Sequence, residues 1–279
     1  MFWKKKGSGA LWGGAIRGEP SDGGNGTLCL KLRLRVLDWA AWAPGLENKS
    51  AWQEWARSPS ASRLDRAVPW PASGAVPPAD AVPPILRRRA GLSDRLALEV
   101  AYALAPKGAN IPSVFASRHG QILRSTGLLE SLAQGTPMSP MDFSVSVHNA
   151  TAGFFSIARG DRSPASALAG GRESFSAALL ESQALLDEGA GRVLAVYHDE
   201  DPPKALDTYW DGEAAGWSLA LVLGHQDGTA LDMKLEDETA DDGGDAGPQA
   251  LAVARLLAKG WGEEHWFNGR HRWTWGIPA

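Results

Sequence analysis

The sequence is poor in cysteine and in long apolar runs. Its single cysteine, Cys29, excludes a disulfide framework and a zinc cluster of thiolates built within the chain. One cysteine also fits a reducing compartment. No segment approaches the roughly 18 uninterrupted apolar residues that a membrane-spanning helix needs. The basic start at Lys4–Lys6 is not followed by the apolar stretch of a signal peptide. We therefore expect a cytoplasmic protein with no membrane span.

Charge of one sign and the common catalytic motifs are also missing. The chain has 28 Lys and Arg against 32 Asp and Glu, and this net charge of −4 does not fit a general nucleic-acid-binding surface. There is no G-x-S-x-G, P-loop, H-E-x-x-H or dinucleotide fingerprint. The six histidines lack metal-ligand spacing, and the acidic stretch from Glu236 to Asp245 carries glycines and alanines where a ligand cage would need oxygens. We expect no metal, no cofactor and no nucleic acid.

The N-terminal third contains a leader, a strand and a connector. Residues 1–26 hold eight glycines without periodicity, so we expect a flexible leader there and a single domain over 27–279. Apolar and basic residues alternate from Leu28 to Val36, which predicts a half-buried strand with a basic, wet face. Six prolines between Val68 and Pro84 predict an extended connector over 68–84.

Beyond the connector, helix and strand signals alternate, which is typical of an α/β layered sheet. We expect helices near 93–104, 123–133, 149–159, 173–188 and 249–258. We expect strands near 111–117, 143–147, 165–169, 193–197, 217–223 and 230–234. After residue 258 we expect only a Trp-rich tail, since four of the 13 tryptophans lie from Trp261 onward.

The stretch from Ser139 to Leu194 resembles the N-terminal half of a β-ketoacyl synthase of the thiolase superfamily. In that family a Ser-Pro opens a strand leading to an Asn-x-x-Ala-Gly motif. A Gly-Pro pair follows, eleven residues after the glycine of that motif. The matching positions are Ser139, Pro140, Asn149, Ala152, Gly153 and Pro164. Ser163 stands in place of the second motif's glycine. The resemblance covers 83–260, and it implies an α/β fold: a mixed sheet flanked by helices, equivalent to the N-terminal half of a thiolase fold.

The resemblance breaks where the family has its nucleophile. The family's catalytic cysteine stands eight residues after the proline, and this sequence has Arg172 there. A guanidinium is not deprotonated at neutral pH and is no nucleophile. The family's two catalytic histidines lie in its second half, and neither His-Gly-Thr-Gly-Thr nor Asn-Ser-Phe-Gly occurs in this sequence. We therefore expect no catalytic residue, and no enzyme activity of the chain on its own.

A ketosynthase-like chain without its cysteine resembles a chain-length factor, and the short form resembles those of aryl-polyene pigment clusters. This implies a heterodimer with a full-length ketosynthase in fatty-acid-like or polyketide synthesis, reached by an acyl carrier protein through that complex. It places Met138, Met141 and Phe143 near the acyl tunnel, with ordinary core packing as the alternative. It also implies that one strand pairs across the dimer, formed by Ala165, Ser166, Ala167, Leu168 and Ala169.

The helix expected over 173–188 offers a separate test of the half-length interpretation. At 100° per residue, Glu173, Glu181 and Glu188 share one stripe, opposite Phe175 and Leu179. Three carboxylates do not stay ionised between two apolar layers without partners. We expect this stripe to face water, or a polar partner, where the family's second half would lie.

Two other functions stay open. An acyl-thioester hydrolase would use Ser174 or Ser166 with His148 or His198, although a nucleophilic serine needs a positioned base. A carrier-protein-binding module would use Arg87–Arg89 and the basic strand face. Thioester turnover by the isolated chain favours the first, and carrier binding without a ketosynthase favours the second.

Overall fold

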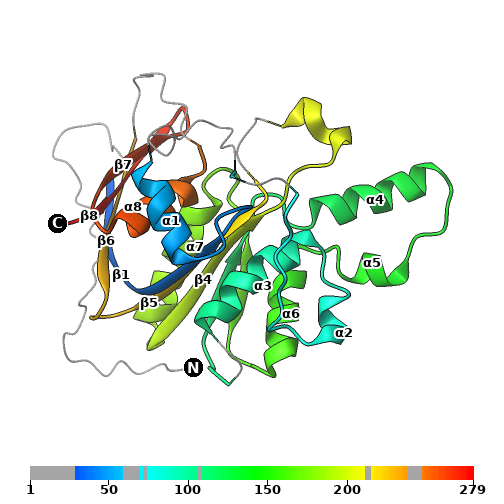
Figure 1. Ribbon diagram of the computed structural model, residues 1–279, viewed down its shortest axis with the longest axis horizontal. Coiled ribbons are helices and arrows are strands. Elements are labelled where there is room, and N and C mark those ends of the chain that lie inside the picture. Colours follow the sequence, from blue (N-terminus) through cyan, green and yellow to red (C-terminus); the bar gives the residue numbers. More distant parts are fainter. Residues whose placement is uncertain (1–28, 59–69, 72–73, 106–107, 211–214, 238–246) are drawn as a thin grey trace, which may run out of the picture.

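The computed structural model describes residues 29–58, 70–71, 74–105, 108–210, 215–237 and 247–279 (Figure 1). The expected leader and part of the expected connector lie outside the described residues. The helices are α1 (Lys49–Arg57), α2 (Pro84–Arg87), α3 (Leu92–Leu104), α4 (Ile122–Ala133), α5 (Pro140–Ser144), α6 (Ala150–Arg159), α7 (Ser174–Asp187), the 3-10 helix η2 (Lys204–Tyr209) and α8 (Gln249–Lys259). The strands are β1 (Cys29–Trp42), β2 (Ser113–Ala116), β3 (Ala165–Leu168), β4 (Arg192–Asp199), β5 (Trp217–Gly224), β6 (Thr229–Asp237), β7 (Gly262–Phe267) and β8 (His271–Ile277).

The eight strands of the described residues form one mixed sheet. Their order is β3-β2-β4-β5-β1-β6-β8-β7. β3, β2 and β4 run parallel, and every other neighbouring pair is antiparallel. Helices supply the crossovers that parallel strands require, with α4 to α6 between β2 and β3 and α7 between β3 and β4. The mixed sheet flanked by helices that the sequence predicts is confirmed.

Helices cover both faces of the central strands. Val193 and Ala195 of β4 belong to the core shared with α1, α7 and α8, while Leu194 and Val196 belong to the core shared with α3 and α6. A strand buried on both faces needs an uninterrupted apolar run, and that is what β4 and β5 have. These runs explain why both strands are recognisable in the sequence.

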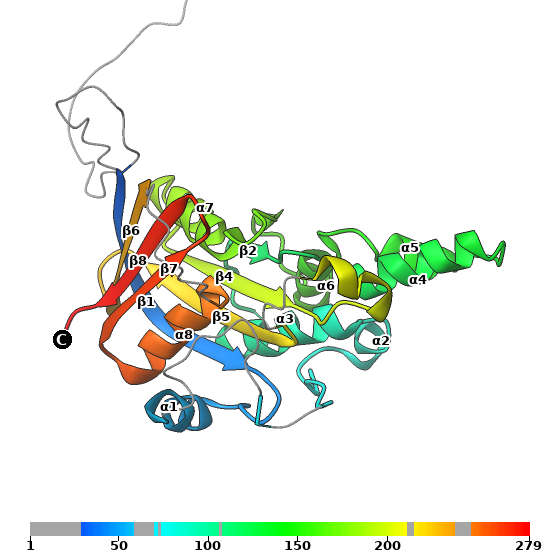
Figure 2. The ribbon, with the colours of Figure 1, turned by 90° about the horizontal axis from the view of Figure 1, so that it is seen from above.

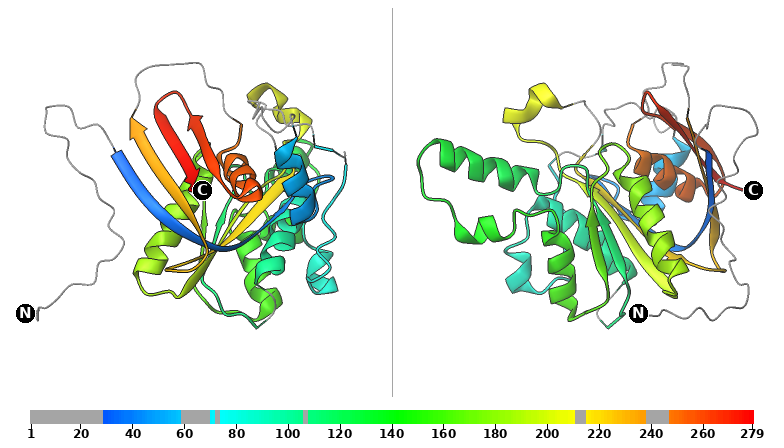
Figure 3. Two further views of the ribbon diagram at one scale, coloured as in Figure 1. Left: turned by 60° about the vertical axis from the view of Figure 1, so that its left-hand side comes forward. Right: turned by 180° about the vertical axis from the view of Figure 1, so that it is seen from behind.

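The first strand, β1, lies in the middle of the sheet and serves two neighbours. Its first half, Cys29–Val36, pairs with β6, and its second half, Arg35–Trp42, pairs with β5. The register shifts between Val36 and Asp38. Gly228, at φ +92°, lies against this irregularity, and a Cβ there would stand 2.3 Å from the carbonyl oxygen of Val36. The predicted alternation of β1 is confirmed over residues 30–36, and the sheet curves around α8 (Figure 3).

The expectation of a loose tail after residue 258 is wrong. β7 and β8 form an antiparallel hairpin that extends the sheet beside β6. The side chains of Trp266, Trp273 and Trp275 are buried, and the last two stack with ring centroids 5.7 Å apart. The signal in the sequence is the alternation of large apolar and polar residues over 271–277, which indicates a strand with one buried face.

The strand expected over 143–147 is also wrong, because Pro140–Ser144 forms α5. Ser139 precedes this helix, and its Oγ accepts the N–H of Asp142 at 3.2 Å. Pro140 occupies the first helical position, where its missing N–H costs nothing. The Ser-Pro pair therefore opens a helix here. At α3 the N-cap is Gly91, so Ser93 lies inside the first turn and is not its cap.

Candidate functional site

Arg172, which the motif spacing predicts at the position of the family's nucleophile, packs against the C-terminal hairpin. The guanidinium of Arg172 lies 5.3 Å from the centre of the Trp266 ring. The neighbouring Glu173 accepts a hydrogen bond from Trp273 Nε1 at 2.7 Å and is hydrogen-bonded to His271 Nδ1 at 3.0 Å. The turn before α7 therefore holds a cation stacked on a tryptophan and a carboxylate bound to the hairpin, neither of which is a nucleophile.

The polar stripe predicted for α7 has polar partners at two of its carboxylates and faces water at the third. Glu173 is covered by the hairpin, and Glu181 accepts a hydrogen bond from Ser166 Oγ at 3.0 Å. Glu188, at the end of the helix, is exposed. On the opposite side Phe175 and Leu179 are buried as predicted. The partners of Glu173 come from the hairpin strands, which the sequence analysis had placed in a tail.

A helical arm projects from the body and exposes most of its apolar side chains. It comprises residues 122–147, with α4 and α5, and extends away from the sheet (Figures 1 and 2). Neither α4 nor α5 buries a side chain. Seven of the 12 exposed large apolar side chains among the described residues lie in the arm: Leu123, Leu129, Leu132, Met138, Met141, Phe143 and Val147. Exposed apolar surface of this extent marks an interaction site.

The three residues that the family resemblance assigns to the tunnel lie in this arm. Met138 is 42% exposed, Met141 53% and Phe143 64%. Ordinary core packing, the alternative considered for them, is therefore wrong for this chain. Their assignment to a tunnel stays a prediction, since a tunnel wall would be completed by another chain.

The strand expected to pair across a dimer is an end strand of the sheet. β3 pairs with β2, and the carbonyl oxygens of Pro164 and Leu168 accept the amides of Ser113 and Ser117. Because the direction of backbone groups alternates along a strand, Ala165 and Ala167 point theirs toward the open edge. The predicted strand thus has backbone donors and acceptors directed away from β2, while Ala169 lies just past its end.

The remaining motif residues surround α6. Asn149 directly precedes the helix, and its side chain makes no capping hydrogen bond. Ala152 is buried against β2 and α3. A Cβ added to Gly153 would meet nothing within 4 Å. No contact within the described residues requires a glycine there. Ile157, one turn further along, is 70% exposed.

The serines considered for a hydrolase are engaged elsewhere. Ser174 Oγ donates to the carbonyl of Gly171 at 2.7 Å, within its own turn. Ser166 Oγ donates to Glu181, as described above. His148 Nε2 is hydrogen-bonded to the carbonyl of Ser117 at 3.0 Å. The structure does not bring these serines together with the histidines that would activate them.

Sequence reasoning missed a buried polar cluster at the carboxyl ends of β2 and β4. His198 Nδ1 lies 3.0 Å from Ser93 Oγ, and burial lowers the pKa of His198 to about 4. Glu200 accepts the amides of Ser93 and Leu123, each at 3.0 Å, and burial raises the pKa of Glu200 to about 7. The polar run His198–Glu200 at the end of an apolar strand is the signal that could have revealed it.

The same cluster reaches the arm through Asp94. Burial raises the pKa of Asp94, whose carboxylate accepts hydrogen bonds from Gln121 Nε2 and Thr151 Oγ1, both at 2.7 Å. The guanidinium of Arg124 lies 3.8 Å from Asp94 and 3.0 Å from Asp142 of α5. Arg124 thereby links the first turn of α4 to the body and ties α5 to that turn.

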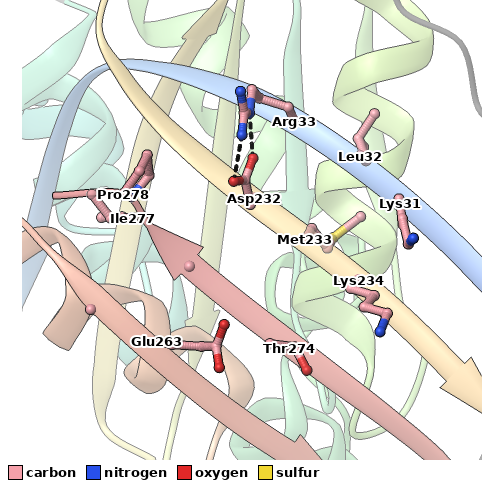
Figure 4. A pocket seen from close by; sticks show the side chains of 12 residues that line it. Lys31, Leu32, Arg33, Asp232, Met233, Lys234, Glu263, Thr274, Ile277 and Pro278 are labelled. Atoms are coloured by element: carbon pink, nitrogen blue, oxygen red, sulfur yellow. Dashed lines mark hydrogen bonds and ion pairs between the residues drawn. The ribbon is translucent and has the colours of Figure 1, made fainter.

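A hollow of about 580 Å³ lies over β1, β6, β7 and β8 (Figure 4). Lys31, Arg33 and Lys234 stand there with Asp232 and Glu263. Arg33 forms a two-pronged ion pair with Asp232, at 2.5 and 2.7 Å. On the basic face predicted for β1, Arg33 is therefore paired with a carboxylate of the neighbouring strand β6.

Other expected features can be located or tested over the part of the chain that the structure describes. Arg87 is paired with Asp80, while Arg88 and Arg89 are exposed. No group of three or more metal-ligating side chains is found among the described residues. Within the same residues, no helix is both long and apolar enough to cross a bilayer.

A family model for the β-ketoacyl synthase N-terminal domain matches residues 52–276. The chain belongs to this family. The match reaches past the 83–260 range of the motif resemblance on both sides, and it takes in α1 and the C-terminal hairpin of this ketosynthase-like chain. A search of curated proteins gives no match.

Solved structures show the same fold. A chain of the ketosynthase ApeO in complex with its chain length factor ApeC, from Xenorhabdus doucetiae, is 25% identical, with a TM-score of 0.73 over 88% of this chain and 99% of that one. The ishigamide ketosynthase/chain length factor gives 12% identity and a TM-score of 0.66, over 88% of this chain and 98% of that one. A chain of the AntDE:AntF complex, a type II PKS acyl-carrier protein with its ketosynthase, gives 12% identity and a TM-score of 0.62, over 88% of this chain and 99% of that one.

Proposed function

We propose that this ketosynthase-like chain is a non-catalytic chain-length factor that pairs with a full-length ketosynthase in fatty-acid-like or polyketide synthesis, of the aryl-polyene type. The observation that carries the proposal is the arm, which exposes seven large apolar side chains. The open edge of β3 supplies backbone groups for a second contact. Similarity to a chain of a ketosynthase–chain length factor complex supports this choice of partner.

A non-catalytic role follows from the chemistry at the family's nucleophile position. A guanidinium is no nucleophile, and that of Arg172 lies over the Trp266 ring. A condensing reaction would need a thiolate there and donors for the developing oxyanion. We therefore assign the covalent chemistry to the partner's cysteine, and the acyl carrier protein would deliver its substrate to the assembled pair.

The contribution of this chain to the product would be steric. Met138, Met141 and Phe143 present apolar volume at the surface of the arm. Placed at the end of an acyl tunnel, such side chains stop chain growth because the next unit has no space. Their burial against the partner and the growing chain would also supply apolar area that the isolated arm leaves in water.

Co-expression with a full-length ketosynthase that carries its cysteine and two histidines tests the proposal. Sizing and mass measurement should show a stable heterodimer that buries well over about 1,000 Å² in total. The isolated chain should self-associate, since it exposes apolar surface and an unpaired strand edge. A well-behaved monomer that shows no association with the ketosynthase contradicts the proposal.

The variant Ala167→Pro tests the β3 edge within that experiment. Proline removes the outward N–H, while the amides that Pro164 and Leu168 accept from β2 keep their partners. We expect thermal unfolding of the isolated chain to change little and heterodimer affinity to fall about tenfold or more. Unchanged affinity would show that the edge does not pair with the partner.

A further inference from the structure

The arm is attached to the body at a root of buried polar groups. Helix α4 packs mainly against α5, and neither helix buries a side chain. A helix of 12 residues is only marginally stable in water by itself. The direction of the arm must therefore be set at its root, where its first turn meets the body.

One carboxylate at this root joins the N-termini of two helices. Glu200 Oε2 accepts the N–H of Ser93 in the first turn of α3, and Oε1 accepts the N–H of Leu123 in the first turn of α4, both at 3.0 Å. The first N–H groups of a helix have no partner inside the helix, and a carboxylate there also complements the helix dipole. Because α3 is packed in the core, Glu200 ties the arm helix to a fixed element.

Arg124 provides a second link, which includes α5. Its guanidinium bridges toward the fully buried Asp94 and toward Asp142, and it donates to the carbonyl of Arg89 at 3.2 Å. These bonds hold the first turn of α4 at Arg124. Glu200 and Arg124 thus restrain α4 from two directions.

We propose that Glu200 is a positioning residue that fixes the direction in which the arm leaves the body, and thereby places Met138, Met141 and Phe143 against the ketosynthase partner. The second part rests on the proposed function, whereas the first part is a property of the isolated chain. Glu200 reaches the tunnel residues only through α4, so its role is to orient them.

Glu200 lies among charged and titratable groups of the body and the arm. The charged groups that face Glu200 are Asp94 from α3, which has the same sign, and Arg124 from α4. His198, on the same strand, is uncharged at neutral pH because burial lowers its pKa to about 4. Protonation of Glu200 would leave one of its two oxygens a poor acceptor.

Hydrogen exchange of the isolated chain tests the positioning role. In Glu200→Gln we expect the amides of α4 to exchange about tenfold faster at pH 8, while the amides of β5 keep their protection. Unchanged protection of α4 in Glu200→Gln overturns the proposal.

Two further variants separate positioning from general loss of structure. Glu99→Gln is the matched control, because Glu99 is also a half-buried carboxylate that accepts a backbone amide, from Ala79 at 2.7 Å, but away from the arm. It should leave α4 unchanged. Leu123→Pro removes only the N–H that α4 gives to Glu200, at a first-turn position that tolerates proline. It should loosen α4 even if Glu200→Gln fails to fold.

Partner binding distinguishes this inference from the proposed function. With a co-expressed ketosynthase, Glu200→Gln should bind about tenfold more weakly and give a broader distribution of product lengths. A loosened arm with unchanged partner affinity would uphold the positioning role and contradict docking through the arm. An arm that stays rigid would overturn the positioning role itself, whatever the affinity.

Discussion

At Arg172, where the motif spacing predicts the family's nucleophile, the chain has a packing contact. Its guanidinium stacks on Trp266, and the adjacent Glu173 is hydrogen-bonded to Trp273 and His271. The residues that would surround a reactive sulfur therefore hold the C-terminal hairpin in place.

Arg172→Cys should not create a condensing enzyme. The substitution supplies a thiol but no histidine pair to support decarboxylation or to stabilise an oxyanion, and it removes the contact with Trp266. The measurement is ketosynthase turnover by the purified variant alone, with the complete ketosynthase as the positive control. Turnover above background would show that this chain carries more of a condensing active site than we infer.

His198 and Glu200 make opposite contributions to stability as the pH changes. The pKa of His198 is about 4 against an ordinary 6.5, so its contribution is present above pH 6.5 and lost as the pH falls toward 4. The pKa of Glu200 is about 7 against an ordinary 4.5, so its contribution is present below pH 4.5 and lost as the pH rises toward 7. Between about pH 4.5 and 6.5 the two effects offset each other.

Glu200→Gln should expose the contribution of His198. The free energy of unfolding should then rise between pH 4.5 and 6.5 by up to about 1.4 kcal/mol per pH unit relative to the unsubstituted chain, because one opposing proton no longer titrates. Urea unfolding at three pH values measures this slope. Glu188→Gln, at an exposed position, is the control and should follow the unsubstituted chain. A slope that matches the control would show that Glu200 does not titrate in this range.

At the scale of elements, the arm differs from every helix that is packed on the sheet. α8 is buried over residues 249–258, whereas α4 and α5 bury no side chain. Substitutions in the arm should therefore affect association and product more than folding.

Replacing Met138, Met141 or Phe143 with alanine should lengthen the products of the reconstituted pair or broaden their distribution. The isolated chain should change in stability by less than about 0.5 kcal/mol, because these side chains are surface-exposed. Product analysis by mass spectrometry and thermal unfolding are the two measurements. Ile85→Ala, an exposed apolar position in α2, is the matched control. Unchanged product length in all three variants would rule out the tunnel assignment.

Elements with a strong periodic signal were predictable from the sequence. β1, β4 and β5 have strict alternation or unbroken apolar runs. The segment around Phe143 was not, because a short stretch of mixed apolar and small residues fits a strand as well as a helix. The Trp-rich hairpin was not predicted, although large apolar residues recur at every second position over 273–277.

The functional site was less predictable, since it depends on residues far apart in sequence. The motif positions and Arg172 follow from spacing along one segment, whereas Met138, Met141 and Phe143 are implied by the family resemblance. The hydrogen bond between His198 and Ser93 joins residues 105 positions apart. The carboxyl ends of β2 and β4, where the cluster lies, meet because these two strands pair in parallel. Exposure of the arm is likewise a three-dimensional fact that residue type does not reveal.

At the scale of the whole molecule, one curved sheet unites two regions through β1. β3, β2, β4 and β5 lie on one side of it and β6, β8 and β7 on the other. The family model spans both regions. The hairpin and α8 therefore belong to the same structural unit as the motif-bearing helices.

The central position of β1 also dictates when the chain can fold as it is synthesised. Arg33 and its partner Asp232 on β6 are 199 residues apart, and β5 on the other side is made only shortly before β6. At typical synthesis rates of about 5–20 residues per second, β1 waits roughly 10–40 s for its first neighbour. During that interval the apolar face from Leu32 to Val36 is uncovered, so β1 is the segment on which we expect chaperones to act while the chain is still on the ribosome.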